Sequence, residues 1–268
     1  MIQSIGFYGF GTLAKTLYLG FNDLLIQNNI ALSIHTRSRP SDRFADLKYV
    51  GQDTLLTISD IIIIAVKPQQ LMDIMPALTR IDWHDKCLVS LLAGVPLTQF
   101  TNSLKNLRHA FRVMPNTSAQ FKESMTTFSL LPSTHSSYET CIISLFSSIG
   151  SIVKVDESQL DFCTALCGSG PAFLYKLLLN MIELAENEGI PSDQARLMIN
   201  QLIQGLASSL HQRPDDLDTL ITEICSPNGT TEAGLEAFSQ QNLSDQWKHV
   251  FLMAKKRSIA LSKEIKSV

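Results

Sequence analysis

The stretch Gly168-Ser169-Gly170-Pro171-Ala172-Phe173 divides the 268-residue chain into two parts with different sequence patterns. Before it, short apolar runs alternate with amphipathic segments; after it, the patterns are helical, with no convincing strand. Proline suits the first turn of a helix, where its missing N–H is not needed, so we expect a helix to begin at Pro171. The two glycines allow the backbone to approach another group closely, which makes the stretch a candidate for a functional role.

The part of the chain before residue 157 is predicted to be a doubly wound α/β domain. Its clearest strand, residues 61–66, is a β-branched run of the kind that lies buried on both faces of a parallel sheet. Strands are expected at residues 2–8, 30–36, 61–66, 86–92, 110–114, 124–130 and 151–155. Helices are expected after Ala14 up to residue 27, and at residues 54–59, 69–79, 97–104 and 136–148. Alternation of this kind is typical of a doubly wound sheet.

The part after Asp156 is predicted to be all-α. Helices are expected at residues 157–167, 171–189, 192–210, 216–225, 230–240 and 243–265. The second of these has a broad apolar stripe that includes Phe173, Leu177 and Met181, and such a stripe needs partners on more than one side. We therefore divide the chain into residues 1–156 and 157–268, and we expect the second domain to dimerise.

The composition argues against several classes of partner. The formal charge of −3 comes with no basic cluster, so neither nucleic acid nor an anionic membrane is expected as a partner. The longest strongly apolar run, residues 61–66, is far shorter than the ~20 residues of a membrane span. Residues 1–6 lack the pattern of a secretory signal, and five scattered cysteines favour reduced thiols, so we expect a cytoplasmic protein.

No metal site is expected from the sequence. Cys163 and Cys167 are four residues apart on a predicted helix, but no histidine or further cysteine lies at metal-ligand spacing. The six histidines are scattered and pair with no obvious carboxylate or nucleophile, so nothing indicates a Ser–His–Asp arrangement.

The pattern Gly9-x-Gly11-x-x-Ala14, directly after the first predicted strand, matches the alanine variant of the dinucleotide-binding fingerprint. The glycines permit a tight turn and close approach of the backbone to a pyrophosphate, which the following helix N-terminus then faces. The alternative is a glycine turn that serves packing only. The candidate cofactor-binding residues here are Gly9, Phe10, Gly11, Thr12 and Leu13.

The end of the second predicted strand bears on the choice of cofactor. NAD-preferring sites place an Asp or Glu there to bind the ribose hydroxyls, whereas this segment reads His35-Thr36-Arg37-Ser38-Arg39. Arg37, Ser38 and Arg39 could hold a 2′-phosphate, the arginines through bidentate, charge-assisted hydrogen bonds from their guanidinium groups. We therefore expect NADP(H) to be preferred over NAD(H); the alternative is that these arginines belong to a solvated turn.

Two further strand ends carry small residues, Ala65-Val66-Lys67-Pro68 and Ala93-Gly94. Ligands of open parallel sheets bind at the carboxyl ends of the strands, so these six residues are candidate cofactor contacts. Taken alone, Lys67-Pro68 is better explained as an ordinary strand stop, and the segment Arg112-Val113-Met114-Pro115-Asn116-Thr117 as a capped turn.

The segment Ser226-Pro227-Asn228-Gly229-Thr230-Thr231 leads into a predicted helix. Successive backbone N–H groups at a helix start form an anion site, so a carboxylate could bind there beside a threonine hydroxyl. The alternative is that the segment has only a structural role, with Asn228-Gly229 as a turn and Thr230 as the cap of the helix. From this segment alone we favour the structural role.

Together these segments resemble the pyrroline-5-carboxylate reductase family over essentially the whole chain. The glycine turn is shared with many dehydrogenases, whereas residues 112–117, 168–173 and 226–231 are more specific to the family. The resemblance implies a dinucleotide-binding Rossmann domain over 1–156 and a helical dimerisation and substrate domain over 157–268. It also implies NAD(P)H-dependent reduction of L-1-pyrroline-5-carboxylate to L-proline, the last step of proline biosynthesis, in a homodimer that can assemble into a decamer.

The resemblance further implies the substrate site. Glu157 matches a substrate-site glutamate, and Ser169 is the serine of the Gly-Ser-Gly-Pro-Ala motif. Gly229 and Thr230 match the loop that holds the substrate carboxylate, and Thr231 matches the hydroxyl near the ring nitrogen. Thr231 is therefore the candidate catalytic residue, assisting protonation of that nitrogen.

The chain departs from the family pattern at Asn228, which replaces a glycine, and at Glu223, which stands where an amide is usual. Asn tolerates positive φ better than most residues, so the turn at Asn228 can survive. A negative charge at Glu223 would oppose a substrate carboxylate. Two alternatives therefore stay open: a diverged, non-catalytic NADP-binding regulatory homologue, or a reductase of another small imino or keto acid.

Overall fold

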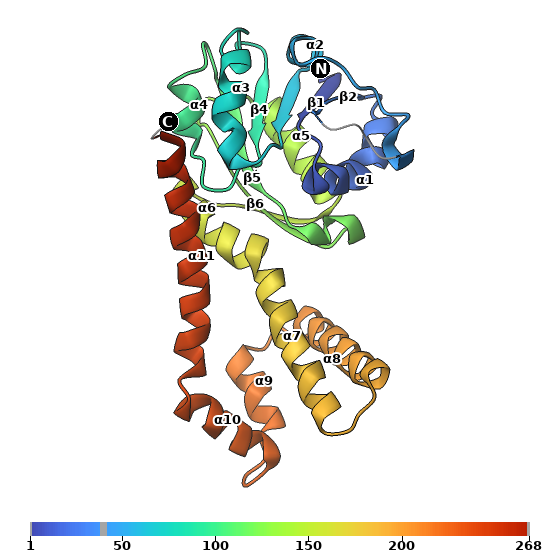
Figure 1. The fold of residues 1–268 in the computed structure, drawn as a ribbon, viewed down its shortest axis with the longest axis vertical. Coiled ribbons are helices and arrows are strands. Elements are labelled where there is room, and N and C mark those ends of the chain that lie inside the picture. The colour runs from blue at the N-terminus through green and yellow to red at the C-terminus, as the bar shows by residue number, and fades with distance from the viewer. Residues whose placement is uncertain (1, 38–41, 267–268) are drawn as a thin grey trace. The chain divides into compact units, whose positions relative to one another are not determined.

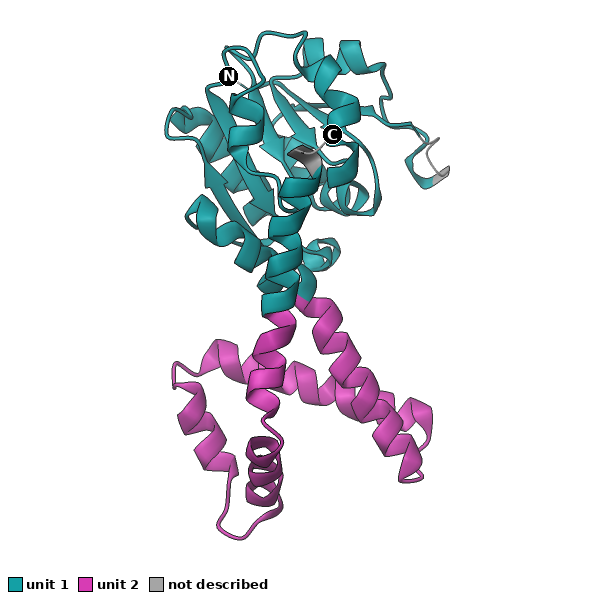
Figure 2. Ribbon diagram, turned by 60° about the vertical axis from the view of Figure 1, so that its left-hand side comes forward, with its two compact units in different colours: residues 1–169, 252–268 teal, residues 170–251 magenta. Residues whose placement is uncertain are grey.

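The computed structural model of the chain describes residues 2–37 and 42–266. By its contacts the chain divides into two compact units (Figure 2). The first, which we call the sheet unit, comprises Met1–Ser169 and Leu252–Val268, and the second, the helical unit, comprises Gly170–Phe251. The predicted division after residue 156 follows the last strand, whereas the contacts assign residues 157–169 and the end of the last helix to the sheet unit.

The sheet unit is built on one seven-stranded sheet with the order β2-β1-β3-β4-β5-β6-β7 (Figure 1). The strands are β1 (Ser4–Tyr8), β2 (Ala31–His35), β3 (Ile61–Ile64), β4 (Cys87–Ser90), β5 (His109–Met114), β6 (Ser124–Leu130) and β7 (Gly150–Lys154). All neighbouring pairs are parallel except β5 and β6, which run antiparallel with Phe111 opposite Leu130. The predicted strands are thus confirmed, and the antiparallel pair is a feature that the sequence analysis did not predict.

Helices cover both faces of the sheet and complete two apolar clusters. The main helices of this unit are α1 (Thr12–Gln27), α2 (Gln52–Ile58), α3 (Leu71–Leu78), α4 (Leu97–Thr101) and α5 (Ser136–Ser147). Ile61 and Ile63 of β3 join the cluster with α1 and α5, whereas Ile62 and Ile64 join the cluster with α2, α3 and α4. All four isoleucines are fully buried, as expected for a strand covered on both faces.

The stretch 168–173 contains the start of α7, one residue before the predicted start at Pro171, but the predicted interruption between residues 167 and 171 is absent. A π-helical segment, Thr164–Ser169, connects α6 (Leu160–Cys163) directly to α7 (Gly170–Asn187). In an α-helix the Cys167 carbonyl would accept a hydrogen bond from residue 171, which as a proline has no N–H to donate. The Asn116 side-chain amide donates to that carbonyl instead, over 3.1 Å, so the helix continues through the proline.

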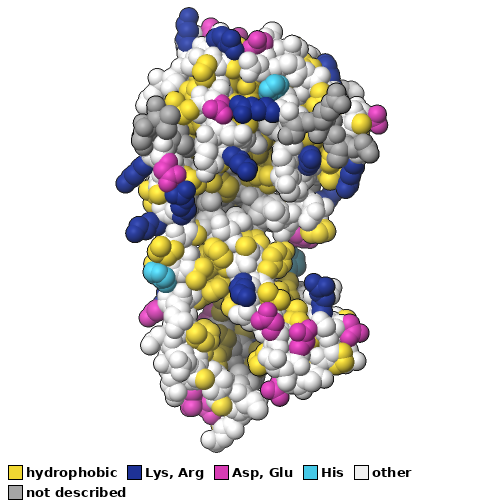
Figure 3. Space-filling view, viewed as in Figure 1, with side chains coloured by type: hydrophobic (Ala, Val, Ile, Leu, Met, Phe, Trp, Pro, Cys, Tyr) yellow, Lys and Arg dark blue, Asp and Glu magenta, His cyan; other side chains and the backbone are white. Residues whose placement is uncertain are grey.

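The helical unit leaves many of its apolar side chains exposed. It contains α7, α8 (Ser192–Gln212), α9 (Leu217–Ile224), α10 (Thr230–Gln240) and the first part of α11 (Leu243–Lys266). The side chains of Leu184 and Leu197 are 63% and 68% exposed, and apolar side chains gather on the surface of this unit in Figure 3. A helical unit of this kind lacks a core of its own, as expected for a domain that packs against a partner.

One helical segment among the described residues, Glu157–Asn187, is long and apolar enough to cross a membrane by length and composition. A helix that is covered by another protein subunit meets the same criterion. The prediction that no membrane partner is involved stays a prediction.

Candidate active site

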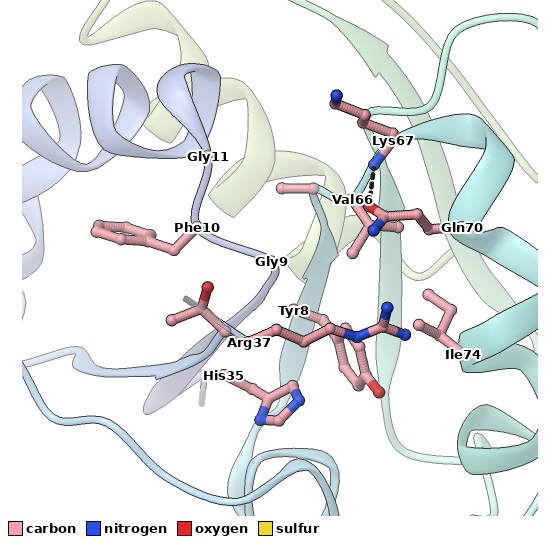
Figure 4. A pocket seen from close by; sticks show the side chains of 12 residues that line it. Tyr8, Gly9, Phe10, Gly11, His35, Arg37, Val66, Lys67, Gln70 and Ile74 are labelled. Carbon is pink, nitrogen blue, oxygen red and sulfur yellow. Dashed lines mark hydrogen bonds between the residues drawn. The ribbon is translucent and has the colours of Figure 1, made fainter. Parts of the chain in front are cut away.

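A pocket of about 260 Å³ lies where three strands of the sheet end (Figure 4). Its lining comes from the end of β1 and the turn after it, the ends of β2 and β3, and the helical segment that follows β3. The lining residues are Tyr8, Gly9, Phe10, Gly11, His35, Thr36, Arg37, Ala65, Val66, Lys67, Gln70 and Ile74. Because β1 lies between β2 and β3, the pocket is at the point where the strand order reverses, which is the usual ligand site of doubly wound sheets.

The glycine turn after β1 is shaped for close backbone approach. Gly9 has a φ of 97°, and a Cβ atom there would lie 2.8 Å from the Ala65 carbonyl oxygen, so a side chain is excluded on both grounds. Gly11 caps α1 without any side-chain hydrogen bond, and a Cβ there would meet nothing within 4 Å. The uncapped first-turn N–H groups of α1 therefore form a suitable site for a pyrophosphate.

The base of the pocket is a packed polar arrangement. The Tyr8 hydroxyl donates to Gln52 Oε1 over 2.9 Å, and the Tyr8 ring packs edge-on against His35 at 4.9 Å. Burial raises the pKa of Tyr8, which keeps the hydroxyl a hydrogen-bond donor to higher pH than in an exposed tyrosine. The Gly9 N–H donates to the His35 carbonyl over 2.8 Å, which ties the glycine turn to the end of β2.

Arg37 extends across the pocket from the end of β2 (Figure 4). Its side chain is 64% exposed, and its Nη2 lies 3.3 Å from Oδ2 of Asp73 on α3. The other predicted phosphate ligands on this segment, Ser38 and Arg39, lie outside the described residues.

Lys67 lines the pocket and is also the N-cap of a short helix. The Lys67 N–H donates to Gln70 Oε1 over 3.2 Å, and Pro68 begins the short 3₁₀ helix Pro68–Gln70. Pro68 and Thr12 do not line the cavity, although each directly follows a residue that does, and Leu13 does not line it either.

Ala93 and Gly94 follow β4 and do not line the cavity. Gly94 has a φ of 76°, and a Cβ atom there would collide with the backbone carbonyl of Ser258 on α11. The glycine is therefore required for packing against α11. Close by, the Leu97 N–H at the start of α4 donates to Glu157 Oε1 over 2.6 Å, so the predicted substrate residue Glu157 is held beside the loop after β4.

A buried ion pair between Arg112 and Asp161 was not predicted from the sequence. Arg112 on β5 is 2% exposed, and its Nη2 lies 2.6 Å from Oδ1 of Asp161, to which the Ser258 hydroxyl also donates over 2.8 Å. A lone arginine in the apolar strand Ala110-Phe111-Arg112-Val113 was the available signal, because a buried guanidinium requires a carboxylate partner.

The predicted substrate residues are divided between the two units. Glu157 and Ser169 belong to the sheet unit, where Ser169 ends the π-helical segment. Gly229, Thr230 and Thr231 belong to the helical unit, where Gly229 is the N-cap of α10 and the threonines begin the helix.

Asn228, in the loop before α10, and Glu223, near the end of α9, both have hydrogen-bond partners in the structure. Asn228 has a φ of 57°, so the expected left-handed turn is present, and its N–H donates to Glu232 Oε2 over 2.6 Å. The Glu223 carboxylate accepts two hydrogen bonds from Arg213, at 2.6 and 2.8 Å, which lower the pKa of Glu223. Arg213 also pairs with Asp215 over 2.9 Å, so its single positive charge is shared between two carboxylates.

Within residues 2–37 and 42–266, no group of three or more His, Cys, Asp or Glu side chains is arranged to hold a metal ion. The glycine turn, the uncapped helix and the cationic end of β2 instead fit a dinucleotide. The fold and this pocket are those of a nicotinamide-nucleotide oxidoreductase with a Rossmann domain.

Comparison with known families narrows this class. The family model described as pyrroline-5-carboxylate reductase dimerisation matches residues 157–261, and the model described as NADP oxidoreductase coenzyme F420-dependent matches residues 4–94. A pyrroline-5-carboxylate reductase of Staphylococcus aureus (strain COL) is 31% identical over 265 residues, covering 96% of this chain and 97% of the relative. Pyrroline-5-carboxylate reductase 2 of Bacillus subtilis is also 31% identical, covering 98% and 96%. The chain belongs to the pyrroline-5-carboxylate reductase family.

Solved structures support the same fold. The Plasmodium falciparum pyrroline carboxylate reductase with NADP bound superimposes with a TM-score of 0.88 at 23% identity, covering 97% of this chain and 98% of that one. The 1-pyrroline-5-carboxylate reductase of Streptococcus pyogenes gives a TM-score of 0.85 at 26% identity, covering 96% and 98%. A Rossmann domain followed by a helical dimerisation domain, as predicted from the sequence, is thus confirmed.

Proposed function

We propose that the chain catalyses the NAD(P)H-dependent reduction of L-1-pyrroline-5-carboxylate to L-proline, the last step of proline biosynthesis. The observation that carries this proposal is the 31% identity to named reductases over 96% of the chain, with the glycine turn of the cofactor pocket intact. When bound, the nicotinamide cofactor supplies the hydride that adds to the carbon of the cyclic C=N bond. The ring nitrogen takes up a proton, and the imine becomes a secondary amine.

The cofactor is proposed to lie across the ends of β1, β2 and β3. The turn at Gly9–Gly11 and the first N–H groups of α1, at Thr12 and Leu13, hold the pyrophosphate. Arg37, together with Ser38, binds the 2′-phosphate of NADP(H), which is the preferred cofactor, with NAD(H) as the alternative. Residues 65–68 and 93–94 line the path of the nicotinamide half along the sheet edge.

The substrate is proposed to be held by residues of both units. Gly229 and Thr230 bind the carboxylate at the start of α10, where backbone N–H groups favour an anion. Glu157 and Ser169 border the ring, and the Thr231 hydroxyl donates to the ring nitrogen. Since a protonated imine is readily reduced, orientation in a dry pocket supplies most of the acceleration and Thr231 a smaller part.

Further properties belong to the same proposal. The active form is a homodimer that can assemble into a decamer, and the dimerisation match over residues 157–261 supports the dimer. The protein is cytoplasmic and works without metal, nucleic acid or membrane partners. The proposal also includes the division into a cofactor domain, 1–156, and a dimerisation and substrate domain, 157–268.

The regulatory alternative is not favoured. That alternative was motivated by two departures from the family pattern, at Asn228 and Glu223. Asn228 adopts the left-handed turn that a glycine would adopt, and Glu223 forms an ion pair with Arg213. The test of the proposal is an assay of purified protein with pyrroline-5-carboxylate, following consumption of NADPH and of NADH in parallel. Turnover with at least one cofactor is expected, and absence of turnover with both would reject the proposal.

A further inference from the structure

The ion pair between Arg37 and Asp73 gives the cofactor pocket a carboxylate that its lining otherwise lacks. None of the described residues that line the cavity is an Asp or Glu. Asp73 lies on α3 between Gln70 and Ile74, which both line the cavity, and its Oδ2 is 3.3 Å from Arg37 Nη2. Both side chains are more than half exposed, so the pair can open when a ligand arrives.

This carboxylate has the chemistry that the end of β2 lacks. NAD-binding sites use an acidic side chain there, which accepts hydrogen bonds from the ribose hydroxyls. In this chain the described end of β2 supplies the cation Arg37, and α3 supplies the acid beside it. The two opposite charges thus lie 3.3 Å apart, one on a pocket-lining residue and one on the helix beside it.

We propose that Asp73 sets the balance between NADPH and NADH. Its carboxylate accepts a hydrogen bond from the 2′-hydroxyl of NADH and repels the 2′-phosphate of NADPH. This inference rests on the proposed use of a nicotinamide cofactor at this pocket. Arg37 alone would make the pocket strongly selective for the phosphate. Asp73 weakens that selectivity and gives the chain use of both cofactors.

Two physical effects act in the same direction. The 2′-phosphate must compete with the Asp73 carboxylate for the Arg37 guanidinium, and an exposed ion pair changes such an equilibrium by up to about fivefold. In addition, a phosphate monoester carries roughly −1.5 to −2 charges at neutral pH and is repelled by a carboxylate that shares its arginine. NADH has no 2′-phosphate, so it neither competes with Asp73 for Arg37 nor is repelled by the Asp73 carboxylate. The 2′-hydroxyl of NADH instead donates a hydrogen bond to that carboxylate.

The test is calorimetric titration of NADPH and NADH into wild-type protein and the Asp73→Asn variant, without substrate. We expect the ratio of NADPH to NADH affinity to rise about tenfold in Asp73→Asn, with NADPH binding more tightly and NADH more weakly. The control is Asp53→Asn, which removes the same charge from an exposed pair with Arg80 of 3.4 Å and should change the ratio by less than about twofold.

An Arg37→Gln variant tests whether the effect passes through the arginine. In the Arg37→Gln background, Asp73→Asn should give a smaller gain in NADPH affinity than in the wild type. Without Arg37 there is no competition for the guanidinium, so Asp73→Asn removes only the repulsion between the carboxylate and the 2′-phosphate. An unchanged or lower ratio in Asp73→Asn, or an equal rise in Asp53→Asn, would overturn the inference while leaving the proposed function intact. Failure of the wild-type protein to bind either dinucleotide would overturn the proposed cofactor and this inference together.

Discussion

Strand β3 and helix α7 are both apolar segments, but they differ in how their side chains are buried. The four isoleucines of β3 are fully buried by the sheet unit itself. In α7, by contrast, Leu174 and Leu184 are 53% and 63% exposed, and Gly170 is the only buried residue of this fully described helix. The sheet unit therefore has a complete core within one chain, whereas the helical unit leaves apolar surface exposed, as a domain that dimerises is expected to do.

The largest expected effect tests this difference directly. Leu197→Asp on α8 should weaken self-association about 1,000-fold, because each of two symmetric copies loses about 1.5–3 kcal/mol of apolar burial. Analytical ultracentrifugation over a range of protein concentrations measures it. Ile26→Asp on α1 is the matched control, since Ile26 is 67% exposed and Leu197 is 68% exposed. A monomeric wild-type protein, or equal behaviour of the two variants, would break the comparison.

The next effect concerns the interior of the sheet unit. Asp161→Ala leaves the buried guanidinium of Arg112 without its partner, which should lower the free energy of unfolding by about 3 kcal/mol. Denaturant unfolding at fixed protein concentration measures this loss. Asp53→Ala breaks the exposed pair with Arg80 and should cost less than about 1 kcal/mol. Similar losses in both variants would mean that the Arg112 pair is not part of a dry interior.

A smaller effect is expected where the π-helical segment meets the sheet. Asn116→Ala leaves the Cys167 carbonyl without its hydrogen bond and should cost about 1–2 kcal/mol of stability. Turnover should fall as well, because the segment ends at Ser169. Asn28→Ala is the control: its amide donates to the exposed Leu24 carbonyl over 2.8 Å, and water can replace it. If Asn116→Ala matched this control in both stability and turnover, the segment would not depend on Asn116.

The sequence was sufficient for features that depend on local pattern. The β-branched run at 61–66 identified the central strand, and the spacing of Gly9 and Gly11 identified the turn that forms the pocket. Both follow from rules that act within a few residues, namely two-sided burial and the conformational freedom of glycine.

Features that join distant segments could not be predicted. Asn116 and Cys167 are 51 residues apart in sequence, Arg112 and Asp161 are 49 apart, and Ser258 and Asp161 are 97 apart. For the same reason the continuous helical run before Pro171 was not predicted, because the amide that satisfies the Cys167 carbonyl comes from another element. The direction of β6 was also open, since strand periodicity is the same in parallel and antiparallel pairs.

The central claim is that the sheet unit binds the cofactor while the helical unit supplies Thr231 to the reaction. The most direct test compares Thr231→Ala with Thr231→Ser, which keeps the hydroxyl, in NADPH titrations and in turnover of pyrroline-5-carboxylate. We expect Thr231→Ala to lower kcat about tenfold and to leave the Kd for NADPH unchanged within about twofold. Thr231→Ser should retain most of the wild-type turnover. Equal losses of NADPH affinity and turnover in Thr231→Ala, or unchanged turnover, would contradict the central claim.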